Sequence, residues 1–154
     1  MKKKLLSILS LLLVIASVTV LVSCNNTVND EQSTATTDSQ KTEIVEATGI
    51  WTSAAYLKDT TLGTGANSIK VEIEAEGQKI TLTINTDKKT LGEAMYELSL
   101  INDASFFDTV IGMKADWNKN QAYWAFYDGE AFMMVGVNEA PINEAANYRL
   151  VYTK

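Results

Sequence analysis

The chain has 154 residues, with 13 basic and 19 acidic side chains, one cysteine, one proline and no histidine. Without histidine the chain has no Ser-His-Asp or Cys-His catalysis and no imidazole metal ligand. A single cysteine excludes an internal disulfide and a cysteine zinc site, and the length suits one folded domain.

The charge is unevenly distributed along the chain. Lys2, Lys3 and Lys4 stand at the start, so the residues after them carry −9 although the whole chain carries −6. Binding to nucleic acid or to an anionic lipid surface requires Lys and Arg. The negative charge after the first lysines therefore argues against binding to nucleic acid and to anionic lipid. The alternative explanation of this charge is that it keeps the domain soluble.

The first 23 residues are predicted to be a secretory signal peptide. The lysines are followed by an uncharged, Leu- and Val-rich stretch from Leu5 to Val22, which ends in Ser23-Cys24. The end of this segment resembles a bacterial lipoprotein lipobox, which implies that Cys24 is diacylated and becomes the mature N-terminus. An uncleaved transmembrane anchor is the alternative, since the apolar stretch is nearly long enough to span a bilayer.

Residues 24–48 are predicted to be the lipidated cysteine and a flexible tether. This stretch is rich in Thr, Ser, Asp and Gln and has almost no large apolar residue before Ile44. Such a composition buries too little surface to offset the entropy of ordering. The folded domain is therefore expected over residues 49–154.

Two strands joined by a tight turn follow a short arm. Apolar and polar side chains alternate over 69–76 and over 80–85, on either side of Gly77-Gln78. This alternation predicts an antiparallel hairpin with one buried face. Before it, Ile50–Leu57 is predicted to be a strand-like arm and Gly63-Thr64-Gly65 a turn.

The periodicity then changes to that of a helix. Thr90 is a natural N-cap, with Glu93 three residues on as in a capping box, and Asn102-Asp103 is the expected end. The apolar residues follow helical spacing: Leu91, Ala94, Met95, Leu98 and Ile101.

The rest of the chain is predicted to return to strands. These strands are Val110–Met113, Ala122–Tyr127, Ala131–Val137 and Asn147–Thr153, with a hairpin turn at Asp128-Gly129. One helix packed on a mostly antiparallel sheet defines an α+β fold.

Several of these segments carry a family resemblance. Tyr123–Gly129, Met134–Val137 and Tyr148–Tyr152 resemble the domain family similar to the transcobalamin and intrinsic factor C-terminal domain, and Thr90–Ala94 and Tyr56–Gly63 also fit. The resemblance implies a β-grasp-like sheet holding one helix. In transcobalamin and intrinsic factor such a domain closes over one face of cobalamin, whereas the bacterial family has no defined function. The chain departs from the family pattern before its last strand, where it has Ala145-Ala146-Asn147.

Aromatic residues are the leading candidates for a ligand site. Tyr123 and Tyr127 face one side of a predicted strand and Trp124 the other, so the rings either fill the core or stack on a flat ligand. The loop before this strand adds Trp117, Asn118 and Asn120, since binding residues favour loops.

Two patterns of oxygen donors have alternative explanations. Asp116, Asn118 and Asn120 match the first half of a calcium loop, but Gln121 and Tyr127 stand where the loop requires Gly and Glu. A polar hairpin loop is the alternative, and we predict no metal site. Glu72, Glu74 and Glu76 share one face of a predicted strand. They are either paired carboxylates like those of a glycosidase or the solvent-exposed face of that strand.

These observations predict an extracytoplasmic lipoprotein, anchored through diacylated Cys24 to the cell membrane of a Gram-positive bacterium. Its domain is expected to bind without catalysis, with no cofactor firmly implied. By resemblance, the ligand is a cobalamin-like cofactor for delivery to an uptake transporter. The alternative is an adhesion module that contacts a surface protein or a wall polymer, and a third hypothesis is an enzyme acting through carboxylates.

Overall fold

The computed structural model describes residues 41–154. The predicted signal peptide, Cys24 and most of the predicted tether lie outside the described residues. Within residues 41–154, neither helix is long and apolar enough to cross a membrane.

The predicted hairpin is confirmed as strands β2 (Asn67–Ala75) and β3 (Gln78–Thr86). Nine residue pairs join these strands in antiparallel register. The turn is Glu76-Gly77, one residue earlier than predicted, and both of its residues have positive φ. The inward-facing side chains of both strands are fully buried: Ile69, Val71, Ile73, Ile80, Leu82 and Ile84.

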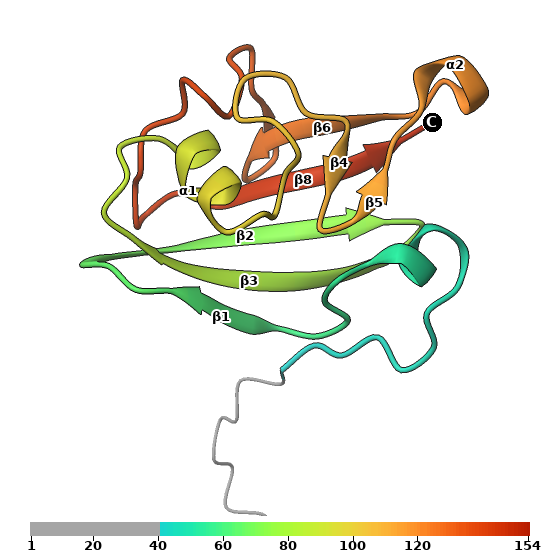
Figure 1. Ribbon diagram of the computed structural model, residues 1–154, viewed down its shortest axis with the longest axis horizontal. Helices are drawn as coiled ribbons and strands as arrows, with labels where there is room; N and C mark the ends of the chain where they lie inside the picture. Colours follow the sequence, from blue (N-terminus) through green and yellow to red (C-terminus); the bar gives the residue numbers. More distant parts are fainter. Residues whose placement is uncertain (1–40) are drawn as a thin grey trace, which may run out of the picture. The chain divides into compact units, whose positions relative to one another are not determined.

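The main sheet has six strands in the order β1-β3-β2-β8-β6-β7 (Figure 1). The remaining strands are β1 (Thr60–Gly63), β6 (Tyr123–Asp128), β7 (Ala131–Phe132) and β8 (Tyr148–Thr153). At the centre, β2 and the last strand β8 run parallel, while β3 and β6 lie antiparallel on either side. A central parallel pair flanked by antiparallel neighbours, with a helix on one face, is a β-grasp arrangement. The predicted α+β class is confirmed.

Helix α1 (Leu91–Glu97) is shorter than the periodicity predicts. The Thr90 hydroxyl caps it by accepting from Glu93 N at 3.3 Å, whereas the Glu93 carboxylate accepts from Lys89 N rather than from Thr90. The prediction that the helix continues to Ile101 is wrong because Ser99 adopts positive φ, which ends the helix. Ile101 instead forms a β-bridge with Val110.

The remaining elements are short. The predicted strand Val110–Met113 is a small hairpin of β4 (Thr109–Val110) and β5 (Met113–Lys114), turning at Ile111-Gly112. The predicted strand Ala131–Val137 shrinks to the two residues of β7, because the chain after Met133 leaves β6 to reach α1, where Gly92 N donates to Val137 O.

The N-terminal arm differs most from its prediction. Ile50–Leu57 is not a strand, because Gly49–Ser53 forms the 3-10 helix η1. Its Trp51 is fully buried, and the indole N–H donates to Ala75 O at 2.8 Å. Ile44, within the predicted tether, is also buried, and its N–H donates to Leu57 O. The folded part therefore begins before residue 49.

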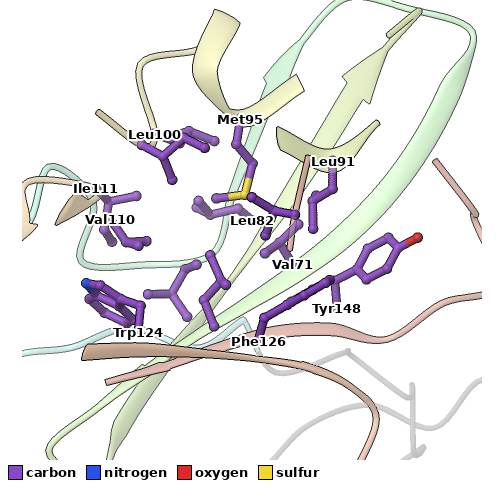
Figure 2. Close-up of a cluster of buried hydrophobic side chains, with 14 of the residues drawn as sticks. Val71, Leu82, Leu91, Met95, Leu100, Val110, Ile111, Trp124, Phe126 and Tyr148 are labelled. Atoms are coloured by element: carbon purple, nitrogen blue, oxygen red, sulfur yellow. The ribbon is translucent and has the colours of Figure 1, made fainter. Parts of the chain in front are cut away.

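One hydrophobic core lies between the sheet and the elements that cover it (Figure 2). Leu91 and Met95 of α1 and Val110 and Ile111 of the small hairpin face the sheet side chains. The sheet contributes Val71, Leu82, Trp124, Phe126 and Tyr148 to this view.

Candidate functional site

A groove of about 500 Å³ lies beside the start of β6. Three parts of the chain form it: the loop before β4, strand β5 with the residues after it, and the segment from α2 (Trp117–Asn120) into β6. Four of the six predicted ligand-binding residues line this groove, namely Trp117, Asn118, Tyr123 and Trp124. Asp116, considered above as a calcium ligand, also lines the groove, and sequence reasoning missed the other lining residues: Phe106, Phe107, Asp108, Lys114, Ala115 and Ala122.

Helix α2 presents Trp117 to the groove. Asp116 caps this single turn, because its Oδ1 accepts from Asn118 N at 3.1 Å and from Lys119 N at 3.2 Å. Gln121 ends the turn in a left-handed conformation. Trp117 is 62% exposed and Tyr123 45%, and their rings meet edge to face at 6.2 Å. Two large aromatic rings are thus available to a ligand.

The same geometry corrects the interpretation of Asp116–Asn120 as either a hairpin loop or a calcium loop. The segment is a capped helical turn, so the Asp116 carboxylate is already occupied by backbone N–H groups. Within residues 41–154, no cluster of three or more carboxylate or other ligating side chains is placed to hold a metal ion.

The opposite wall of the groove is a loop held by its own polar side chains. Asp103 Oδ1 accepts from Ser105 N at 2.7 Å and from Phe106 N at 2.9 Å, and these bonds lower the pKa of Asp103. Asn102 Oδ1 accepts from Asp108 N and Thr109 N. The loop carries Phe106 with 86% of its side chain exposed. The sequence feature that could have predicted this wall is the apolar pair Phe106-Phe107 within a polar stretch.

A charged pair adds polar groups to the groove. Lys114 Nζ lies 3.3 Å from Asp108 Oδ2, and both side chains are partly exposed. The Thr109 hydroxyl, which donates to Asp108 at 2.7 Å, is the largest cause of the lowered pKa of Asp108, and Lys114 and Asn102 lower it further. The groove therefore offers an ammonium and a carboxylate beside its rings.

Three of the six candidates are poorly placed for a ligand in the groove: Trp124, which lines it but faces the core, and Tyr127 and Asn120, which lie outside it. Trp124 is only 8% exposed, belongs to the core (Figure 2), and donates through Nε1 to Met113 O at 3.3 Å. Tyr127 lies at the far end of β6, 5.5 Å from the Phe132 ring. Asn120 is not part of the groove lining, and its amide donates to the Tyr152 hydroxyl at 3.1 Å.

Glu72 and Glu74 of β2 and Glu76 of the turn that follows are all paired with cations. Arg149 donates to Glu72 at 3.1 Å and to Glu74 at 2.9 Å, and Lys154 donates to Glu76 at 2.8 Å. These bonds raise the pKa of Arg149 and lower that of Glu76. With each acid bonded to a cation, these side chains form a charged network.

Solved structures with a similar fold exist. A proposed metal-binding protein from Ruminococcus gnavus ATCC 29149 matches with a TM-score of 0.53 at 21% identity, over 58% of this chain and 98% of that chain. Haptocorrin in complex with Cbi matches with a TM-score of 0.43 at 12% identity, over 60% of this chain and 26% of that chain. The first match shows a shared fold, and the second is too distant to support an argument.

No known protein family matches the chain at the sequence level. No curated protein matches it either.

Proposed function

We propose that this protein is a non-catalytic ligand-binding module whose ligand lies in the aromatic groove. The observation that carries the proposal is that Phe106, from the loop before β4, and Trp117 and Tyr123, from α2 and β6, line one groove and all remain exposed. Single exposed apolar side chains are common, whereas a contiguous group marks an interaction site. The volume of about 500 Å³ lies within the range of small-molecule sites.

We propose a cobalamin-like cofactor as the ligand, on the basis of the sequence resemblance. Trp and Tyr faces stack on flat rings, and Lys114, Asp108 and Asn118 supply hydrogen-bonding groups for amide substituents. An open groove covers a large ligand on one side only, which suits capture followed by transfer. The proposed setting is outside the cytoplasm, where Cys24 tethers the protein near an uptake transporter.

The test is a titration of the full chain in nonionic detergent with cyanocobalamin and with cobinamide, observed by tryptophan fluorescence. We expect quenching at micromolar ligand, equivalent to about −8 kcal/mol of binding free energy. Trp117→Phe should keep the affinity while removing much of the quenched signal, because the indole nearest the ligand is lost. N-acetyltryptophanamide measures the quenching that arises only from absorption of light by the corrinoid.

Variants separate the groove from the rest of the molecule. Trp117→Ala and Tyr123→Ala should weaken binding at least tenfold, which corresponds to about 1.4 kcal/mol. Tyr96→Ala removes an exposed ring from α1, outside the groove, and should leave the affinity unchanged. Absence of quenching beyond the control would contradict the corrinoid assignment. Quenching by soluble wall-polymer fragments instead, abolished by Trp117→Ala, would favour the adhesion alternative.

A further inference from the structure

A second exposed apolar surface lies at the opposite end of β6 from the groove. Tyr123 and Tyr127 are four residues apart, or about 13 Å along a strand. Beyond Tyr127, β7 and the chain that follows expose Phe132 (54%) and Met134 (91%), with Val135 beside them. The proposed ligand site does not use these residues.

The backbone of β7 is an open sheet edge. β7 is the last strand in the sheet order, so within residues 41–154 no strand pairs with its outer side. Its register pairs Asp128 with Ala131 and Tyr127 with Phe132, and Met133 N donates to Phe126 O at 2.9 Å. Because bonding alternates along an antiparallel pair, the N–H and C=O of Phe132 point away from β6.

The chain covers the other edge of the sheet in part. At the β1 edge, residues 42–44 pair with the chain just before β1, since Ile44 N donates to Leu57 O and Asp59 N to Thr42 O. Native edges are usually blocked by such coverage, by charged side chains such as lysine, by proline or by a very short edge strand. From Asp128 to Ala140 the chain has neither lysine nor proline. Although β7 has only two residues, its outward backbone groups have no strand partner within residues 41–154, and neither lysine nor proline shields them.

The charge beside this edge is negative. Asp128 and Glu130 lie at the turn between β6 and β7, and no basic residue occurs from Asp128 to Phe132. Arg149 reaches Glu130 at 3.2 Å but is also bonded to Glu72 and Glu74, so the acids outnumber it. A second copy of this chain would bring like charges together across the edge, which is unfavourable.

We propose that the edge of β7 accepts an extended, basic segment of a partner protein, which adds a strand to the sheet. The backbone of Phe132 would supply hydrogen bonds, Phe132 and Met134 would contact alternate apolar side chains, and Glu130 would attract lysine or arginine. Strand addition of this kind takes affinity from the main chain and specificity from alternate side chains.

The test uses two capped ten-residue peptides, one alternating valine with lysine and one alternating valine with glutamate, added to the full chain in nonionic detergent. We expect the lysine peptide to bind with micromolar affinity and to slow amide exchange over 131–134, and we expect added salt to weaken it. The glutamate peptide should not bind.

Two variants and a control decide the outcome. Phe132→Ala combined with Met134→Ser should weaken the lysine peptide at least tenfold, and Glu130→Lys, a change at an exposed turn residue, should do so without affecting the fold. Trp117→Ala, in the groove, should leave peptide binding unchanged. Equal binding of both peptides, protection of β1 instead of β7, or no binding at about 1 mM peptide would overturn the proposal.

Discussion

Two tryptophans seven residues apart have opposite roles. Trp124 lies in the core with its indole N–H bonded to Met113 O, whereas Trp117 is 62% exposed on a single helical turn. Trp124→Ala should therefore destabilise the fold by about 3–5 kcal/mol, because it leaves a large cavity. Trp117→Ala should change stability by less than about 0.5 kcal/mol, as surface substitutions usually do. Urea denaturation of both variants measures this difference.

The comparison also tests the assignment of the groove. A large loss of stability in Trp117→Ala would mean that this ring supports the fold, and its effect on ligand binding would then carry no information about the site.

Two glycines with similar backbone conformations provide a second test at the residue scale. Gly112 and Gly77 have φ of 88° and 77°, so an alanine at either position costs about 1–2 kcal/mol of left-handed strain. A Cβ on Gly112 would also collide with the Ser53 carbonyl oxygen of η1, whereas a Cβ on Gly77 meets nothing within 4 Å. Gly112→Ala should therefore lower the thermal midpoint clearly more than Gly77→Ala. Equal midpoints would mean that the arm is not packed against the β4–β5 turn.

At the scale of elements, the loop that carries Phe106 depends on a carboxylate. Bonds from Phe106 N and Ser105 N lower the pKa of Asp103 from its ordinary value of 3.8. A carboxyl with a depressed folded pKa stabilises the loop above the unfolded value and loses this effect as the pH falls through the folded pKa. The loop should therefore stay ordered from pH 7 to about pH 4 and open below that.

Amide exchange at Ser105 and Phe106 measures this opening. Asp103→Ala should show fast exchange at both amides already at pH 7 and weaker binding in the groove. Protection that is unchanged in this variant would show that Asn102, which accepts from Asp108 N and Thr109 N, holds the loop by itself.

The elements also show where sequence patterns were sufficient. The β2–β3 hairpin could be predicted because its inner face is apolar from Ile69 to Ala75 and from Ile80 to Ile84, and a register shift would expose all of these residues. The length of α1 could not be predicted. Leu98 and Ile101 continue the helical spacing, but the chain turns at Ser99 so that Ile101 can pair with Val110. The helical spacing of apolar residues gives no information about a pairing between Ile101 and a residue nine positions further on.

At the scale of the whole molecule, the proposed lipid anchor has its own test. Cys24→Ala should abolish incorporation of labelled palmitate and move the protein from the membrane fraction to the medium or to an uncleaved precursor. The physical reason is that two acyl chains supply stable anchoring that a polar tether lacks. Labelled palmitate that still enters the variant would exclude Cys24 as the attachment site.

The sequence by itself determined the fold class, the central hairpin, the position of the helix start and most of the aromatic residues beside the groove. These properties depend on the alternation of apolar and polar residues, on helix capping and on composition, all of which involve residues close together in the sequence. Only the tertiary structure decided that Trp124 is core while Trp117 is exposed, that Phe106 and Lys114 join the same groove, and that Ile44, in the predicted tether, belongs to the fold. The physical reason is that burial and the assembly of a site depend on contacts between segments far apart in the chain. These contacts form only when the helix, hairpin and loops pack on the sheet.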